Sequence, residues 1–267
     1  MSECLECLPF MVKNLLSIEK YSLQVPMGKD KHFSFNLHLF LGTLAFGFII
    51  LFYKNKLLKL IGILKIKSHD KIKEFLHQEH VGRISSIDVN GYPQIIPMNF
   101  VFLNDVIYLH SHTKGEKIEN FKRNEKVGFE IDKELEFLPS YFEDPKDASL
   151  ADTLYISVVI KGTASLVTDK EEKTFALNGL LKKYQPEGRY DPIKPDMRVL
   201  DAVAVIKIVP KILHGKYKIG QNLSPLDRLD LAQKILKRNS PTAQETLKIM
   251  GFEIIDEELK MIDEPKW

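Results

Sequence analysis

The fold is decided by residues 81–132, which have the sequence VGRISSIDVNGYPQIIPMNFVFLNDVIYLHSHTKGEKIENFKRNEKVGFEID. Val81–Asp88 alternates between apolar and polar side chains, the pattern of a strand with one buried face. Two apolar stretches follow, Gln94–Leu103 and Val106–His112, and a tight-turn sequence precedes each of them, N-G and N-D respectively. N-G is a strong short-range hairpin signal. The three stretches therefore predict an antiparallel meander, in which Pro97 marks an edge or a bulge.

More strands are predicted after the meander. Val127–Ile131 is a fourth short strand, and Leu154–Val167 is a long strand or a bent pair with a bulge at Gly162. Val203–Val209 closes the set. The polar segment Lys133–Ala151 is predicted to be a loop, and its length suggests a functional or interface role. Six or so short antiparallel strands with helices between them predict a mainly β, α+β fold, in the form of a small closed or split barrel.

Apolar residues at helical spacing predict helices at Asp70–Gln78, Ile118–Asn124 and Asp169–Tyr184. Two more helices are predicted near the C-terminus: Pro225–Lys237, with Ser224 as its cap, and Pro241–Met250, which follows Ser240. This C-terminal tail has no catalytic spacing of its own. We expect it to cover the barrel or a partner subunit.

Residues 1–66 form an N-terminal extension, ahead of a barrel domain at 67–217 and the helical tail at 218–267. Residues 35–53 are mostly apolar, and their length is near that of a helix that crosses a bilayer. Lysines are more numerous after this run than before it, so an anchor here would leave the following domain in the cytoplasm. A single transmembrane helix is one interpretation. A buried or interfacial helix, or an upstream extension that is not normally translated, is the other.

The third predicted strand runs into a helix through His110–Lys117, which has the sequence HSHTKGEK. The first N–H groups of a helix lack intrahelical acceptors and lie at the positive end of its dipole, so they can bind a phosphate. Gly115 leaves the backbone open to close approach. Thr113 and Glu116 have the spacing of a capping box. Positive charge is available from two lysines, Lys114 and Lys117. The segment predicts a phosphate site, and an ordinary capped surface helix is the alternative.

Composition argues against several classes of protein. The 267 residues include 38 Lys and Arg against 36 Asp and Glu, and a net charge of +2 gives no general attraction for nucleic acid. Cys4 and Cys7 form one C-x-x-C, but a zinc site needs four ligands and no second pair exists, so no metal site is predicted. A reducing compartment is the default for such a chain. The G-x-G-x-x-G signature of nicotinamide-binding Rossmann folds is absent.

Residues 72–216 resemble the FMN-binding split β-barrels of the pyridoxamine 5′-phosphate oxidase-like superfamily, most closely its nitroimidazole-resistance-type branch. An ordered series carries the resemblance: G-R-I in the first strand, the G-Y-P turn, P-x-N-F in the second strand, an aromatic-x-H-S strand end, and R-N in the helix. Residues 215–228, GKYKIGQNLSPLDR, are similar to the tail of flavin-binding proteins labelled negative transcriptional regulators. The resemblance implies a six-stranded antiparallel split β-barrel with flanking helices, and a homodimer with FMN in a cleft between subunits.

The resemblance also implies which residues bind FMN. The second-strand residues expected beside the isoalloxazine and the ribityl chain are Ile95, Ile96, Pro97, Met98, Asn99 and Phe100. His110 and Ser111 match the strand-end pair that approaches the cofactor. Lys117 matches the family's phosphate-binding lysine, and Lys114 is a weaker addition. Contacts from the second subunit are also expected, but the sequence does not assign them.

For function, the resemblance implies a flavin-dependent oxidoreductase in which FMN passes electrons from NAD(P)H to a small acceptor. His110 is the position expected nearest the flavin and is a candidate proton donor. A histidine hydrogen-bonded to backbone is the alternative for both His110 and His112. A non-enzymatic flavin-binding or regulatory module and a haem-binding split barrel are rival functions. Oxidation of pyridoxamine phosphate is not expected, because the chain ends in IDEPKW and lacks arginine-rich substrate elements there.

Overall fold

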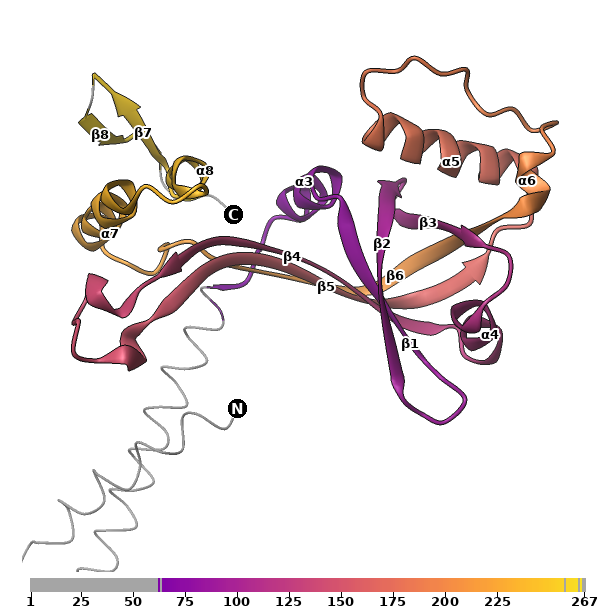
Figure 1. Ribbon diagram of the computed structural model, residues 1–267, viewed down its shortest axis with the longest axis horizontal. Coiled ribbons are helices and arrows are strands. Elements are labelled where there is room, and N and C mark those ends of the chain that lie inside the picture. The colour runs from indigo at the N-terminus through magenta and orange to yellow at the C-terminus, as the bar shows by residue number, and fades with distance from the viewer. Residues whose placement is uncertain (1–61, 63, 257, 264, 266–267) are drawn as a thin grey trace, which may run out of the picture. The chain divides into compact units, whose positions relative to one another are not determined.

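Six antiparallel strands follow one another around a closed barrel in the order β1-β2-β3-β6-β5-β4 (Figure 1). The computed structural model describes residues 62, 64–256, 258–263 and 265. The strands are β1 (Val81–Ile87), β2 (Pro93–Leu103), β3 (Val106–His112), β4 (Lys126–Leu138), β5 (Asp152–Leu166) and β6 (Val203–Lys218). The predicted six-stranded antiparallel barrel is therefore confirmed.

The N-terminal extension is not part of the described chain. Both cysteines and the apolar run at 35–53, which we interpreted as a possible membrane anchor, lie outside the described residues. Within the described residues, the helices are all too short or too polar to cross a membrane.

The last three strands are longer than predicted. β4 continues through Leu138, so the prediction that Lys133–Ala151 is a loop is wrong over its first part. The charged residues of this stretch lie on a strand that pairs with β5, and only two short 3₁₀ turns, η1 (Ser140–Phe142) and η2 (Ala148–Leu150), belong to the connection. The bulge predicted at Gly162 is confirmed, because the register between β5 and β6 shifts between Lys161 and Gly162.

The predicted helices are present, with small changes at their ends. They are α3 (His69–Gln78), α4 (Glu116–Arg123), α5 (Lys170–Tyr184), α7 (Pro225–Arg238) and α8 (Ala243–Ile249). Two features were not predicted: the short helix α6 (Val199–Ala202) and a C-terminal hairpin of β7 (Phe252–Ile255) and β8 (Glu258–Met261). Side chains of Ser68, Asp169 and Ser224 cap α3, α5 and α7 by accepting a hydrogen bond from a first-turn N–H.

Apolar side chains fill the barrel and continue beneath the tail. One cluster joins barrel residues such as Phe100 and Phe129 to tail residues such as Ile235 and Leu247. A second cluster lies where α5 covers the outer side of β2, β3 and β6, and it includes Val101, Tyr108, Leu177, Leu180 and Val205. Figure 1 shows α5 lying over these strands. Because the tail shares the main cluster, it packs as part of the barrel's own core.

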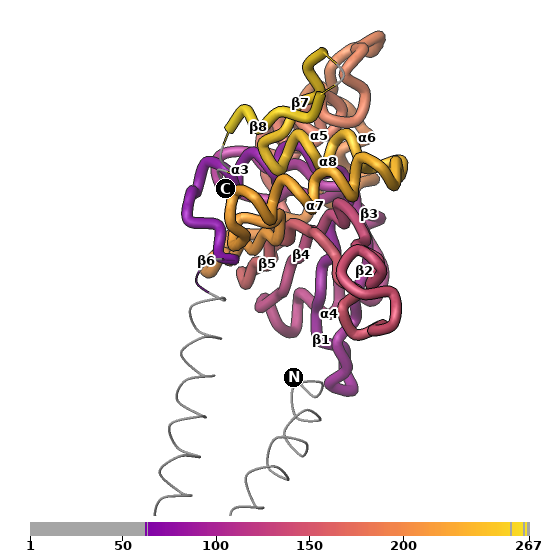
Figure 2. The backbone as a smooth tube through the Cα atoms, turned by 90° about the vertical axis from the view of Figure 1, so that its left-hand side faces the viewer, coloured from indigo at the N-terminus to yellow at the C-terminus, as the bar shows by residue number. Residues whose placement is uncertain are grey.

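A buried carboxylate also fastens the tail to β4. Glu136 is only 1% exposed, and its carboxylate accepts hydrogen bonds from Arg238 Nη1 at 2.6 Å, from Thr242 Oγ1 at 2.7 Å and from the Ser240 hydroxyl. All three partners lie at the end of α7 or in the turn before α8. Figure 1 shows the tail at one end of β4 and α4 at the other, and Figure 2 shows α7 and α8 next to each other.

The tail motif that resembles flavin-binding regulators has a local structural role. The Gln221 side chain accepts a hydrogen bond from Ile219 N–H at 2.9 Å and donates one to the Tyr217 carbonyl at 3.0 Å. Ser224 then caps α7, and Arg228 of the same motif lies in the first turns of α7 and is 2% exposed. These polar residues build the turn from β6 into α7, so the motif requires no ligand to explain it.

Replacing Glu136 with alanine should destabilise the protein by about 2–3 kcal/mol, because it removes the hydrogen bonds that the buried carboxylate accepts and leaves the partly exposed Arg238 guanidinium without its counter-charge. Urea unfolding at neutral pH measures this loss. Glu134→Ala is the matched control: the side chain is exposed on the same strand, and we expect a change within about 0.5 kcal/mol. Equal stability of the two variants would contradict the conclusion that the Glu136 carboxylate fastens the tail to β4.

Candidate functional site

The strands β2 and β3 separate halfway along their length. They pair only from Leu103↔Val106 to Phe100↔Leu109. Beyond this point Pro93–Asn99 of β2 pairs with β1, whereas His110–His112 of β3 pairs with β6. The two edges that face each other here have no strand partner in the described chain. The residues predicted from the sequence to bind a cofactor lie on both sides of this split.

The edge position predicted for Pro97 is confirmed. Pro97 opposes Arg83 of β1, and in this part of β2 the edge toward β3 is open in the described residues. A proline has no N–H to donate, so an open edge tolerates it well. Pro93 lies on the same edge, opposite Ile87. The two prolines make this edge a poor template for pairing with a further strand.

The candidate residues of β2 alternate between two faces. Ile95, Pro97 and Asn99 are exposed, and Ile95 keeps 62% of its surface in contact with solvent. Ile96 and Met98 are partly buried against the main apolar cluster. Phe100 is fully buried at the point where β2 and β3 begin to pair. The first five residues are therefore accessible at the split, and Phe100 anchors the strand behind them.

His110 and Ser111 lie on opposite faces of β3. Ser111 shares its side of the strand with the core residues Ile107 and Leu109, and its hydroxyl oxygen is buried with no hydrogen-bond partner in the described chain. His110 and His112 are exposed on the other face. His112 Nδ1 accepts a hydrogen bond from Lys114 N–H at 3.1 Å, which leaves the proton of its neutral form on Nε2. A buried hydroxyl without a partner is unusual in a native protein, so Ser111 points to a missing acceptor or donor.

The helix α4 begins with an uncapped turn. Its N-cap is Gly115, with φ of 136° and no side-chain cap, so the capping box predicted for Thr113 and Glu116 is wrong. Glu116 is the first residue of the helix instead of the third, which puts it out of position for that motif. In the described chain the N–H groups of Glu116 and Lys117 have no acceptor, and a Cβ on Gly115 would meet no atom within 4 Å.

Two uncompensated lysines flank this helix end. Lys117 is partly buried and Lys114 is exposed, and neither forms an ion pair in the described residues. Lys122 of the same helix differs, because it pairs with Glu119 at 2.9 Å. Glu116 is the acidic side chain closest in sequence and is exposed. The helix end therefore offers free N–H donors and ammonium groups beside the split, an arrangement suited to an anion.

Sequence reasoning missed the part that Tyr184 plays. The sequence predicts it only as the last residue of a helix, but in the structure its hydroxyl accepts a hydrogen bond from Phe100 N–H at 2.8 Å. The same oxygen lies 2.9 Å from the Phe100 carbonyl and also contacts the His80 carbonyl. His80 and Phe100 would be the next pair in the β1–β2 ladder, so the phenol replaces a ladder bond there. Burial raises the pKa of Tyr184, which keeps the hydroxyl protonated.

Lys183 contacts the ring of Phe100. Its ammonium donates a hydrogen bond to the Leu76 carbonyl at 3.1 Å and lies 3.9 Å from the centre of the Phe100 ring. Burial lowers the pKa of Lys183 from 10.5 to about 8, and the nearby Glu79 carboxylate acts in the opposite direction. Lys183 and Tyr184 together fix the residue at which β2 and β3 diverge.

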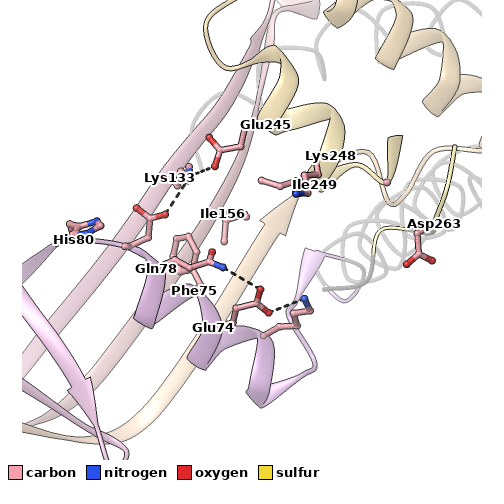
Figure 3. A pocket seen from close by; sticks show the side chains of 13 residues that line it. Glu74, Phe75, Gln78, His80, Lys133, Ile156, Glu245, Lys248, Ile249 and Asp263 are labelled. Carbon is pink, nitrogen blue, oxygen red and sulfur yellow. Dashed lines mark hydrogen bonds and ion pairs between the residues drawn. The ribbon is translucent and has the colours of Figure 1, made fainter. Parts of the chain in front are cut away.

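A cavity of about 730 Å³ lies elsewhere, among α3, β4, β5 and α8 (Figure 3). Lys133 Nζ stands between Glu245 at 2.5 Å and Glu79 at 3.7 Å, and Gln78 donates a hydrogen bond to Glu74 at 3.2 Å. None of the sequence-predicted site residues lines it. A smaller cavity of about 320 Å³ lies between η1 and α7 and also contains none of them. In the described residues, no three His, Cys, Asp or Glu side chains converge on a metal site.

Comparison with known proteins gives a family and a fold. The sequence matches the family described as pyridoxamine 5′-phosphate oxidase over residues 68–217, more than half of the chain. A Mycobacterium smegmatis protein described as binding FAD and haem has 14% identity and a TM-score of 0.50, over 58% of this chain and 73% of that one. A candidate 5-nitroimidazole antibiotic resistance protein from Bacteroides thetaiotaomicron has 24% identity and a TM-score of 0.49, over 57% of this chain and 86% of that one. Comparison with curated proteins gave no match.

The lowered pKa of Lys183 predicts a pH effect on stability. Between about pH 8 and 10.5 the native state loses this proton while the unfolded state keeps it, so the free energy of unfolding should rise with pH in this window. Relative to Lys183→Met, the wild type should gain about 1 kcal/mol, a value reduced for the partial exposure of the ammonium. Urea unfolding at about pH 7 and about pH 10 measures this. Lys182→Met, an exposed neighbour, is the control, and parallel profiles for wild type and Lys183→Met would refute the assignment.

Proposed function

This chain belongs to the pyridoxamine 5′-phosphate oxidase family, and we propose that it binds FMN at the split between β2 and β3 and catalyses a flavin-dependent oxidoreduction. One observation carries the proposal. The unpaired strand edges, the partnerless Ser111 hydroxyl and the uncapped start of α4 all belong to the same short stretch of structure, within the described residues. Each of the three lacks a protein partner there, and a flavin nucleotide carries groups that satisfy all of them.

The phosphate of FMN would be held at the start of α4. The Glu116 and Lys117 N–H groups would donate to its oxygens, and the Lys117 and Lys114 ammonium groups would supply charge. Glu116 is exposed at the first helical position, so it can turn toward solvent. The open space at Gly115 allows an oxygen to approach the backbone closely. The phosphate would therefore be bound both by the charge of the two lysines and by the N–H groups at the start of the helix.

The ring and the ribityl chain of FMN would lie along β2. The exposed edge from Ile95 to Asn99 offers backbone N–H and carbonyl groups, interrupted at Pro97, and apolar side chains for one face of the ring. Ser111 would supply its hydroxyl from the opposite side of the split. When bound, FMN supplies reversible two-electron transfer, and the protein supplies binding, orientation and electrostatics.

A second copy of the chain would complete the site. The outer face of the sheet carries exposed apolar side chains on neighbouring strands, at Val81, Ile95, Val159 and Ile212. The register aligns Ile95 with Ser85, and Ser85 with Gly128, so this face continues from β2 across β1 to β4. These apolar side chains alternate with polar ones such as Ser85 and Arg83, and a mixed surface of this kind next to an open site is compatible with a subunit interface. We therefore propose a homodimer in which the partner covers the exposed side of the flavin.

His110 is the proposed proton donor. Its imidazole is exposed on β3 at the split, and it has no hydrogen-bond partner in the described chain. An imidazole in this position can protonate an acceptor as that acceptor is reduced. Reduced nicotinamide is the proposed donor of electrons, and a small nitroaromatic or quinone-like compound is the proposed acceptor.

Lys117→Ala should weaken FMN binding by about 1.5–3 kcal/mol, because one charge-assisted contact to the phosphate is lost. Titration of apoprotein with FMN, followed by flavin fluorescence, gives the dissociation constant. Lys122→Ala removes the same charge from the same helix, but its ammonium is already paired with Glu119, and we expect about a twofold effect at most. Equal dissociation constants for wild type and Lys117→Ala would remove this lysine from the site. Failure of the wild type to take up flavin would refute the proposed function itself.

His110→Ala should lower the turnover of NAD(P)H with a quinone or nitroaromatic acceptor by about a hundredfold or more, while FMN stays bound. Stopped-flow absorbance separates flavin reduction from reoxidation, and the defect should lie in reoxidation. His112→Ala is the control, because its imidazole is exposed on the same face but bonded to Lys114 N–H. If wild-type protein retains FMN yet no donor reduces it, the protein is a flavin-binding module and has no oxidoreductase activity.

A further inference from the structure

A buried amide connects α4 to the first hairpin of the barrel. Asn120, in the middle of α4, is 1% exposed. Its Nδ2 donates to Ser86 Oγ at 3.1 Å and to Gln94 Oε1 at 3.2 Å. Its Oδ1 accepts from Arg123 Nη2 at 2.7 Å, and the same guanidinium nitrogen donates to the Ile87 carbonyl at 3.2 Å. The side chain is thus bonded on both sides to groups that are themselves held by β1 and β2.

The arginine fixes which way the amide faces. A guanidinium can only donate hydrogen bonds, so the atom of Asn120 that faces Arg123 has to be the oxygen. The NH₂ group then has to face Ser86 and Gln94, both of which can accept. A flipped amide would place its NH₂ group against the guanidinium, so that two donors would face each other. The network therefore permits a single orientation of the side chain.

The two acceptors belong to one cross-strand pair of the β1–β2 ladder. Ser86 and Gln94 are direct partners in the register, and Gln94 precedes Ile95, an exposed candidate flavin residue on β2. Asn120 bonds to both members of this pair, which fixes where α4 lies along the ladder. Lys117 lies three residues before Asn120 and therefore on the same face of the helix. The position of the amide consequently sets the position of that lysine relative to the open edge.

Apolar packing alone would hold α4 less specifically. Ile118 and Phe121 of the helix are buried in the main cluster, and such contacts tolerate small slides and rotations. A buried amide does not tolerate them, because a displaced group loses hydrogen bonds in a dry environment. The network thus adds directional restraint at the helix whose first turn carries the proposed phosphate donors.

We infer that Asn120 is a positioning residue for the phosphate of the flavin nucleotide, acting by fixing α4 so that its N-terminus and Lys117 face the β2 edge. This inference rests on the proposed function. It distinguishes two parts of the ligand: the phosphate, which depends on α4, and the ring with the ribityl chain, which depends on β2 and β3. Riboflavin has the second part without the first. A comparison of FMN with riboflavin therefore isolates the contribution of Asn120.

Asn120→Leu tests the inference, because leucine keeps most of the buried volume and removes every side-chain hydrogen bond. FMN affinity should fall by about tenfold, while riboflavin affinity changes by no more than about twofold. Isothermal titration of full-length apoprotein with each ligand gives the ratio of the two affinities, and thermal unfolding gives the stability. Thr246→Val is the matched control: this buried tail hydroxyl bonds the Leu135 carbonyl, so the variant should lose stability without changing the ratio.

A second variant covers the case in which Asn120→Leu does not fold. Ser86→Ala/Gln94→Leu removes both acceptors and leaves the Asn120–Arg123 bond, and it should lower the FMN-to-riboflavin ratio in the same direction. The inference is overturned if the folded variants keep the wild-type ratio of FMN affinity to riboflavin affinity, whether both affinities are unchanged or both fall by the same factor. Equal affinity of the wild type for FMN and riboflavin would instead refute the proposed phosphate site, which keeps the two failures apart.

Discussion

The site depends on the way in which one strand exchanges partners. A strand has two edges, and β2 uses one edge for β1 over Pro93–Asn99 and the other for β3 over only four residues. The remaining length of that second edge is open because β3 bends away to follow β6. Such an edge is costly, since its N–H and carbonyl groups find no strand to bond them. Natural sheets conceal such edges, so an edge that stays open beside a helix terminus calls for a functional explanation.

Several side chains maintain this divergence. Tyr184 and Lys183 fix Phe100 from one side, so the branching point cannot migrate along the ladder. Asn120 fixes α4 at the other side of the split. The two restraints come from helices far apart in sequence: Tyr184 bonds the backbone of β2 at Phe100, and Asn120 bonds side chains of β1 and β2. The chain thus builds a rigid frame around the part of the sheet that is left unpaired.

Much of the fold could be predicted because the signals are local. Alternating side chains, the Asn90-Gly91 turn and apolar residues at helical spacing depend on residues within a few positions of one another, and they predicted the meander and most of the helices. The extension of β4 was missed because its charges resemble a loop. Some of these charges are satisfied by other elements: Lys133 pairs with Glu245 of α8, and Glu136 pairs with Arg238 of α7. Pairings of this kind join residues more than a hundred positions apart, which no local pattern records.

In the candidate site, too, the residues with a local or family signal were predicted, and those whose partners lie in distant elements were missed. The family resemblance and the helix-end argument pointed to Lys117, Ser111 and the β2 edge; the structure places Ser111 and the β2 edge on the two sides of one split, and α4 begins four residues after β3 ends. The capping box failed because a spacing of three residues does not determine where a helix begins. Tyr184 and Asn120 were missed because their partners lie in other elements. Tyr184 resembled one more member of an apolar stripe, and Asn120 one more polar residue in a charged helix.

The carboxylate of Glu136 has a consequence for how this chain can vary among its relatives. The acid belongs to the barrel, yet each of its hydrogen-bond partners belongs to the appendage that follows. A barrel that ended at β6 would leave position 136 in water, where many residues would serve equally well. Once the appendage covers it, neither side can change alone. Position 136 should therefore vary together with positions 238, 240 and 242 among relatives. An acidic residue at this point of a barrel sequence would then predict that C-terminal helices follow the barrel.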